Sequence, residues 1–289
     1  IVMKSKITVL GGDARTLTAA EELRRAGYTV TLCGFGTESN AFLRESLSHA
    51  DAVILPMPVT RDCKTVNAPL AGSPIGMELL LQSVRKGALL LGGQFPCGFL
   101  SEAGEAGLTP VDYALCEALQ IRGAVATAEA ALAIVINETP ITVGGMAVAI
   151  LGFGRIARLL ARSLRALGAA VTVFARKEEA LAWAEADGHR AVAFSSLAGE
   201  LARFDVIVNT VPEQVLPASL LPSVRRDTLI LDLASAPGGV DFEEARTLGL
   251  HAIHALGLPG KNAPLTAGKD LAKTILAVLE EKKELYIHE

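Results

Sequence analysis

A glycine-rich turn carries the clearest chemical signal in the chain. Gly152, Gly154 and Ala157 fit the pattern GxGxxA, directly after the apolar run "VAIL" and at the start of a helical pattern. The first glycine permits a tight turn, the second lets backbone N–H groups approach a pyrophosphate, and the alanine allows close packing of helix on sheet. The context predicts a dinucleotide site, and a purely structural glycine turn is the alternative.

Two cations end the second strand of this unit, where an acidic residue usually binds the ribose hydroxyls of NAD. Arg176 and Lys177 stand there instead. A guanidinium binds phosphate through two parallel hydrogen bonds, so this pair favours NADP over NAD. The alternatives are that Arg176 stacks on the adenine or is simply solvated. S-adenosylmethionine is disfavoured, because that cofactor also usually requires an acidic residue here.

Further candidate cofactor contacts follow the ends of the expected strands. A dinucleotide lies along the carboxyl ends of the strands in such a sheet. The residues that we expect beside it are Gly152, Phe153, Gly154, Arg155, Ile156, Ala175, Arg176, Lys177, Thr210, Val211, Pro212, Ala234, Ser235 and Gly257. We expect an irregular loop after the last strand of this domain, with Thr266 as the N-cap of a final helix.

A second stretch, Ile7–Gly36, aligns without gaps on Val148–Lys177. Gly11 falls on Gly152, but Asp13 occupies the place of Gly154. A side chain and a negative charge would then stand where a pyrophosphate needs bare backbone. We therefore expect no dinucleotide in this half. Arg15 becomes a candidate ligand for a substrate carboxylate, with an ordinary surface arginine as the alternative.

These residues require two α/β domains with parallel sheets. Strands rich in Val, Ile and Leu alternate with helical patterns, as in sheets that are buried on both faces. We expect a flavodoxin-like domain over residues 1–123 and a Rossmann domain over 124–268. The joining helix lies in Ala124–Thr139, and a last helix over 269–289 packs on the first domain. The expected strands are Lys6–Leu10, Thr29–Cys33, Ala52–Pro56, Ala88–Gly92, Ala147–Leu151, Ala170–Ala175, Val206–Thr210, Thr228–Leu233 and His251–Ala255, and the expected helices are Arg15–Ala26, Gly76–Lys86, Arg155–Leu167, Glu178–Asp187 and Phe242–Leu248.

The composition sets wider limits. The 289 residues are 51% hydrophobic and 20% charged, which suffices for two globular domains. A net charge of −4 gives no reason to expect nucleic acid or an acidic membrane as a partner. The most apolar run is too short to span a bilayer, and no signal peptide is evident. Four cysteines without a CxxC spacing indicate reduced, mostly buried thiols in a cytoplasmic protein, and the five histidines show no metal-ligand spacing.

Several of these motifs together resemble the A subunits of bacterial dipicolinate synthase. The similar stretches, in order, are "GGDAR", "TAEAA", "LGFGR", "NTVP", "LDLASAPGGVDF" and "GLPGKNAPLTAG". The resemblance implies a cytoplasmic, sporulation-related enzyme that oxidises a dihydrodipicolinate-type intermediate of the lysine pathway to dipicolinate with NADP. It also implies a flavoprotein-like B subunit. The stretch Pro56–Ser73 resembles the family only loosely, and Ile121–Ala130 lacks an expected Asn and Pro.

That chemistry assigns roles to residues outside the cofactor motif. A dicarboxylate requires cations, and the first domain offers Arg15, Arg61, Lys64 and Arg122. If water must also leave the substrate, Asp13 and Glu129 are the candidate acid–base groups. The remaining alternatives are a dehydrogenase of another small dicarboxylate or of an amino or hydroxy acid, and a noncatalytic NADP-binding subunit. We also expect a homo-oligomer.

Overall fold

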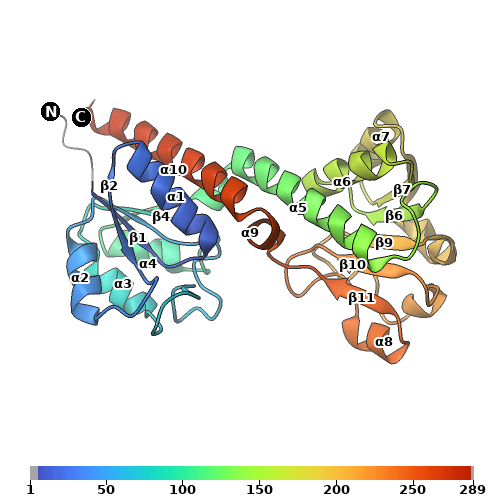
Figure 1. Ribbon diagram of the computed structural model, residues 1–289, viewed down its shortest axis with the longest axis horizontal. Coiled ribbons are helices and arrows are strands. Elements are labelled where there is room, and N and C mark those ends of the chain that lie inside the picture. Colours follow the sequence, from blue (N-terminus) through green and yellow to red (C-terminus); the bar gives the residue numbers. More distant parts are fainter. Residues whose placement is uncertain (1–5, 288–289) are drawn as a thin grey trace. The chain divides into compact units, whose positions relative to one another are not determined.

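The chain forms two compact units in the computed structural model, which describes residues 6–287. One unit comprises the described residues up to Gly123 together with those from Ala263 on, and the other comprises Ala124–Asn262. Each unit is built around its own parallel sheet (Figure 1).

The first unit has a five-stranded sheet in the order β2-β1-β3-β4-β5, which is the flavodoxin-like order. Its strands are β1 Lys6–Leu10, β2 Thr29–Cys33, β3 Ala52–Ile54, β4 Leu89–Gly92 and β5 Thr109–Asp112. Its helices are α1 Ala14–Arg25, α2 Asn40–Ser48, α3 Met77–Ser83, α4 Phe99–Glu105 and α10 Pro264–Ile287, with a 3-10 turn at Tyr113–Leu115. Helices α2 and α4 and strand β5 are not predicted from the sequence.

Helices cover both faces of this sheet. Alternate strand residues point to opposite sides, as the pleat requires. Ile7, Val9 and Ile54 pack with α1 and α10 on one face, whereas Leu10 and Val53 pack with α2, α3 and α4 on the other. The near-continuous apolar strands of the sequence are explained by this burial on both faces.

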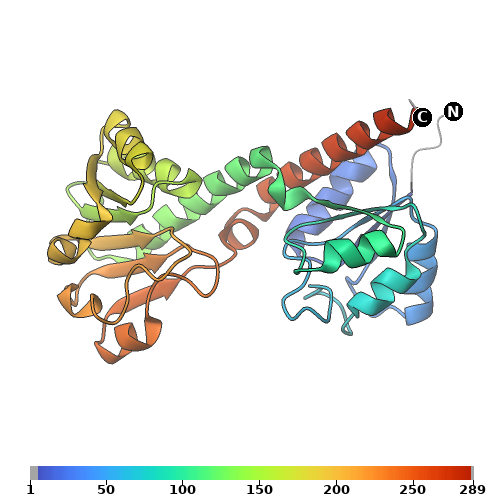
Figure 2. The same ribbon diagram turned by 180° about the vertical axis from the view of Figure 1, so that it is seen from behind.

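Helix α10 packs along α1, and both views show the two helices side by side (Figures 1 and 2). Gly268 makes the close approach possible, because a Cβ there would lie 2.5 Å from Cβ of Thr18. The expectation that Thr266 caps this helix is wrong. The helix begins at Pro264, and the carbonyl of Ala263 accepts its first hydrogen bond, so Thr266 lies within the first turn.

The second unit has a six-stranded sheet in the order β11-β10-β9-β6-β7-β8, which is the Rossmann order. Its strands are β6 Ala147–Leu151, β7 Ala170–Ala175, β8 Arg190–Ala193, β9 Val206–Asn209, β10 Leu229–Asp232 and β11 His251–His254. Its helices are α6 Arg155–Ala166, α7 Glu178–Ala186, α8 Phe242–Thr247 and α9 Leu258–Asn262, with 3-10 turns at Phe194–Gly199, Leu201–Arg203 and Leu221–Ser223. Residues 258–262, where we expected an irregular loop, are therefore the short helix α9.

Helix α5, Glu117–Glu138, carries the chain from the first unit into the second. It is long and apolar enough to cross a membrane by length and composition alone, contrary to the sequence-based estimate, which counted a shorter run. Packing accounts for part of this apolar character: 44% of the apolar window is buried, whereas Ile121, Val125 and Ile136 are exposed. Ala128, Ala131 and Val135 are buried in the core of the second unit, together with residues of β6 and α6.

The repeat seen in the sequence is a repeat of structure. β1 and β6 each have five residues, and α1 and α6 each have twelve. In each unit the glycine after the first strand donates its N–H to the carbonyl at the end of the second, from Gly11 to Cys33 and from Gly152 to Phe174, both at 2.8 Å. The two halves share one βαβ design, but the position before the first helix is Asp13 in the first unit and Gly154 in the second.

The cysteines are free, as expected, but they are not mostly buried. Cys33 is buried and Cys116 is partly buried, whereas Cys63 and Cys97 are exposed. Among the residues whose side chains the structure describes, 6–282, no group of histidine, cysteine or carboxylate side chains could hold a metal ion.

Candidate functional site

The glycine turn of the second unit has the geometry that a pyrophosphate requires. Gly152 has φ +89°, and a Cβ there would lie 2.7 Å from Oγ1 of Thr210, so only glycine fits without strain. Gly154 is the N-cap of α6, and a Cβ at this position would meet nothing within 4 Å. Bare backbone and the positive end of a 12-residue helix thus face open space, which fits a bound dinucleotide phosphate.

Every strand of this sheet is parallel, so the loops after the strands meet along one edge. The predicted cofactor residues follow β6 (Gly152, Phe153, Gly154, Arg155, Ile156), end or follow β7 (Ala175, Arg176, Lys177), follow β9 (Thr210, Val211, Pro212), follow β10 (Ala234, Ser235) and follow β11 (Gly257). The structure therefore brings them to a single edge. Thr210 is fixed there, since its hydroxyl donates to the carbonyl of Leu151 at 2.8 Å.

Two of these residues, Phe153 and Ile156, have side chains that pack within the second unit. The ring of Phe153 lies 5.8 Å from the guanidinium carbon of Arg158 and makes an edge contact with His189 at 6.0 Å. Ile156 packs against the core of the second unit. Their side chains are thus engaged in packing, and only their backbone is offered to a ligand by this arrangement.

Arg176 is held by a residue that the sequence analysis did not consider. Its guanidinium forms an ion pair with Glu213, in the loop after β9, and lies 5.7 Å from the ring centre of Phe194. Both partners are largely exposed, at 57% and 63% of their side-chain surface. The cation stands at the end of β7, where a ribose 2′-phosphate is expected.

A buried carboxylate organises the loop after β10, and the sequence analysis missed it. Asp232 is fully buried and accepts hydrogen bonds from Nδ2 of Asn209 at 2.8 Å and from the backbone N–H of Ala234 and Gly239 at 2.9 and 2.7 Å. The His254 ring nitrogen Nε2 lies 2.9 Å from the carbonyl of Ala234. The available signal was an aspartate closing an apolar strand, "LILD".

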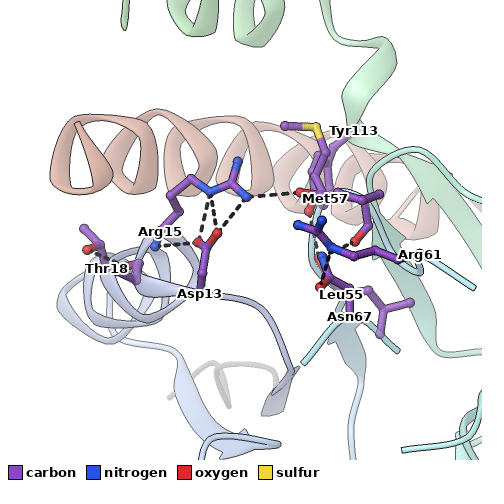
Figure 3. Close-up of polar contacts among 10 residues, drawn as sticks. Asp13, Arg15, Thr18, Leu55, Met57, Arg61, Asn67 and Tyr113 are labelled. Carbon is purple, nitrogen blue, oxygen red and sulfur yellow. Dashed lines mark hydrogen bonds and ion pairs between the residues drawn. The ribbon is translucent and has the colours of Figure 1, made fainter. Parts of the chain in front are cut away.

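In the first unit the corresponding turn holds an ion pair instead of open space. Asp13 is the N-cap of α1 and accepts from the backbone N–H of Arg15 at 3.0 Å. The guanidinium of Arg15 binds the same carboxylate: Nε donates to Oδ1 at 2.9 Å and Nη2 donates to Oδ2 at 2.9 Å (Figure 3). Nη2 also donates to the carbonyl of Met57 at 3.1 Å. Asp13 therefore fills the pyrophosphate position with a charge that is already paired.

This pairing changes the acidity of Asp13. Partial burial alone would raise the pKa of the carboxyl, but the hydrogen bonds and positive charge of Arg15 outweigh it and hold the pKa below its ordinary value. A carboxylate with a lowered pKa is a weak proton acceptor. The geometry thus favours an orienting role for Asp13 over the acid–base role.

A second cation lies near the same strand end. Nε of Arg61 donates to Oδ1 of Asn67 at 3.2 Å, and Nδ2 of Asn67 donates to the carbonyl of Pro58 at 3.0 Å. Arg61 is part of the segment that follows β3, and Arg15 contacts the same segment from α1 (Figure 3). Arg61 and Asn67 also line a cavity of about 340 Å³ in residues 61–74.

The other candidates for substrate binding or acid–base chemistry lie apart from the Asp13–Arg15 pair or are engaged elsewhere. Arg122 pairs with Asp270 at 3.7 Å and so links α5 to α10. Lys64 is exposed beside Asp62, which accepts from its backbone N–H. Glu129 is exposed on the part of α5 that belongs to the second unit, whereas Asp13 and Arg15 belong to the first.

Known proteins match both units of the chain. The family model for the N-terminal domain of the dipicolinate synthase A subunit matches residues 6–114, and the NAD-binding domain model of D-isomer specific 2-hydroxyacid dehydrogenases matches residues 133–231. The A subunit of dipicolinate synthase from Bacillus subtilis is 31% identical over 285 residues, which cover 96% of each chain.

Solved structures agree with this match. The crystal structure of the dipicolinate synthase A subunit from Bacillus halodurans superposes with a TM-score of 0.87 at 30% identity, over 96% of this chain and 98% of that one. The A chain from Bacillus subtilis gives a TM-score of 0.86 at 30% identity, over 98% of both chains. A transhydrogenase from Sinorhizobium meliloti shares the fold at 16% identity, with a TM-score of 0.70 over 96% of this chain and 95% of that one. With its Rossmann edge and glycine turn, the chain is a nicotinamide-dependent dehydrogenase and belongs to the family of dipicolinate synthase A subunits.

Proposed function

We propose that this protein oxidises a dihydrodipicolinate-type intermediate of the lysine pathway to dipicolinate. The observation that carries the proposal is the match to the A subunit of dipicolinate synthase over 96% of the chain, at 31% identity. The reaction removes a hydride and a proton from a dihydropyridine ring and leaves an aromatic product. Such a step requires mainly that the ring and the cofactor be held in the right orientation.

We further propose that the cofactor is NADP. When bound, it supplies the hydride acceptor. The support is the cation at the end of β7, where Arg176 and Lys177 stand in place of an acidic residue. A guanidinium there offers a 2′-phosphate charge-assisted hydrogen bonds that a ribose hydroxyl cannot match.

The substrate carboxylates, in this proposal, bind to cations of the first unit. Arg15 is the first choice, because it follows the strand-end turn directly and is 19% exposed while its orientation is fixed by Asp13 and Met57. Arg61 is the second choice, because it lies in the segment after β3 that Arg15 also contacts. In this proposal the first unit, up to Gly123 and again from Ala263, forms the substrate domain, and Ala124–Asn262 forms the cofactor domain. The second domain thus ends six residues before the expected boundary at residue 268, because helix α10 begins at Pro264 and belongs to the first unit.

The assembly and location of the enzyme follow from the same proposal. The relatives are named as A subunits, so we propose that the partner is a flavoprotein-like B subunit. We also propose a homo-oligomer of this chain and a cytoplasmic site of action during sporulation.

Turnover with the proposed substrate tests this function. The purified chain is mixed with NADP and enzymes that generate dihydrodipicolinate, with and without a B subunit, and NADPH and dipicolinate are measured together. We expect equal amounts of both products. NADP binding without turnover, even when the B subunit is present, would instead identify a noncatalytic NADP-binding subunit. Turnover of another dicarboxylate, or of an amino or hydroxy acid, in preference would correct the substrate.

A further inference from the structure

The Arg176–Glu213 ion pair crosses the strand that carries the glycine turn. Arg176 follows β7, Glu213 follows β9, and β6 lies between these two strands in the sheet. Neighbouring strands are about 4.8 Å apart, so the pair spans roughly 10 Å across the carboxyl end of β6. Gly152 and Gly154 stand at that same end. A dinucleotide that lies on the turn must therefore meet this pair.

The chain thus supplies a carboxylate to the cofactor edge from an unexpected strand. The usual acidic residue is missing from the end of β7, but Glu213 reaches the same guanidinium from the loop after β9. Both side chains are more than half exposed, so water and salt screen the pair and either partner can be exchanged. A ribose 2′-phosphate is the anion that would replace Glu213 on Arg176.

We infer that Glu213 is a specificity-determining residue, whose carboxylate competes with the 2′-phosphate of NADP for Arg176. NADP has to displace Glu213 from the guanidinium, whereas NAD leaves the pair intact. Glu213 therefore lowers the affinity for NADP selectively and limits the preference that Arg176 creates. The inference rests on the proposed preference for NADP.

The test uses 2′,5′-ADP and 5′-AMP, which differ by the 2′-phosphate and require no turnover. The full-length chain and the variants Glu213→Gln, Arg176→Gln and the double variant are titrated calorimetrically with each nucleotide at low salt. Glu213→Gln should tighten 2′,5′-ADP binding roughly three- to tenfold and leave 5′-AMP unchanged. High salt should narrow this gain. In the Arg176→Gln background the gain should fall below about twofold, because the competition acts through the guanidinium.

A matched control is Glu179→Gln, which removes a carboxylate from the first turn of α7, three residues from Arg176. It should change neither affinity. If Glu213→Gln raises the affinity for 2′,5′-ADP equally with and without Arg176, Glu213 repels the phosphate directly and the inferred competition is wrong. The inference is also wrong if Glu213→Gln leaves 2′,5′-ADP binding unchanged or weakens 5′-AMP binding. The proposed NADP preference fails separately, if the unmodified chain and Glu213→Gln both bind 2′,5′-ADP no more tightly than 5′-AMP.

Discussion

The guanidinium of Arg15 grips both carboxylate oxygens of Asp13, which lies two residues earlier at the N-cap of α1. The bidentate contact leaves the side chain of Arg15 with one orientation, and its Nη2 is fixed further by the carbonyl of Met57. The structurally equivalent position of the second unit is Gly154, which leaves open space for a phosphate. The same βαβ design thus carries an ion pair of two side chains in the first unit, and bare backbone with free space beside it in the second.

The role of Arg15 is tested by Arg15→Ala. If Arg15 binds a substrate carboxylate, the apparent KM for the dicarboxylate should rise roughly tenfold or more, the scale of a lost charge-assisted hydrogen bond of about 1.5–3 kcal/mol. The Kd for NADP should not change, because the cofactor edge belongs to the other unit. Steady-state kinetics and a cofactor titration check both points. Unaltered KM would remove Arg15 from the substrate site.

Asp13→Asn separates orientation from proton transfer. An asparagine keeps the N-cap but loses the charge that holds Arg15, so KM should rise by less than in Arg15→Ala while kcat changes little. A large loss of kcat with a normal KM would instead favour Asp13 as the proton acceptor.

The pH dependence of stability offers an independent measure of the same ion pair. The pKa of Asp13 is lowered in the folded state, so its contribution to stability is present above the ordinary aspartate pKa of about 3.9 and is lost as the pH falls through the lower folded value. The difference in unfolding free energy between the unmodified chain and Asp13→Asn should therefore be constant near neutral pH and shrink only in acid. Denaturant unfolding at several pH values measures it, and a difference that disappears near pH 7 would contradict the assignment.

Much of the fold could be predicted because parallel strands buried on both faces leave an unmistakable apolar pattern. β1, β2, β6 and β7 have the predicted bounds. The missed strands β5 and β8 lie at sheet edges, have four residues each and are only partly buried, so their sequences "TPVD" and "RAVA" carry little pattern. Helices α2 and α4 are short as well.

The site was predictable only where local sequence determines it. Gly152 and Gly154 are recognisable because a turn and a helix start require them within three residues. Glu213 is 37 residues from its partner Arg176, and the contact arises from strand order, which no local pattern reveals. Asp232 belongs between these cases, since a carboxylate at the end of a buried strand indicates a hydrogen-bonded role but not its partners.

Cofactor preference is tested by Arg176→Asp. This change replaces the cation at the end of β7 by an anion that also faces Glu213, so NADP binding should weaken by about 1.5–3 kcal/mol, whereas NAD binding should change far less. Parallel titrations with the two cofactors measure the difference. Equal losses for both would show that Arg176 does not bind the 2′-phosphate.

Asp232→Ala should be strongly destabilising. The change leaves the buried N–H groups of Ala234 and Gly239 without their acceptor and removes one of the two hydrogen bonds that Nδ2 of Asn209 donates, the other being to the carbonyl of Val211. The expected cost is about 3 kcal/mol or more. Chemical denaturation measures the loss. The control is Asp227→Asn, since Asp227 is 74% exposed and its removal should cost little. Similar stabilities of the two variants would mean that the Asp232 network does not hold this loop.

Two substitutions in the glycine turn should separate folding from binding. In Gly152→Ala the new Cβ would lie 2.7 Å from Oγ1 of Thr210 at φ +89°, so the fold itself should be destabilised, by at least about 1–2 kcal/mol. In Gly154→Asp the side chain enters open space at φ −85°, so the unfolding free energy should stay close to that of the unmodified chain.

For NADP binding, Gly154→Asp should be the more damaging of the two substitutions. Gly154→Asp reproduces the first unit's Asp13 at the positive end of α6, and its carboxylate would occupy and repel the pyrophosphate, so NADP binding should be abolished in a folded protein. Gly152→Ala should lose binding only to the extent that it unfolds. Calorimetric titration with NADP beside denaturant unfolding resolves the two effects. Near-normal NADP affinity in a folded Gly154→Asp variant would mean that the phosphates do not lie on this turn, because no dinucleotide could share the space with that side chain.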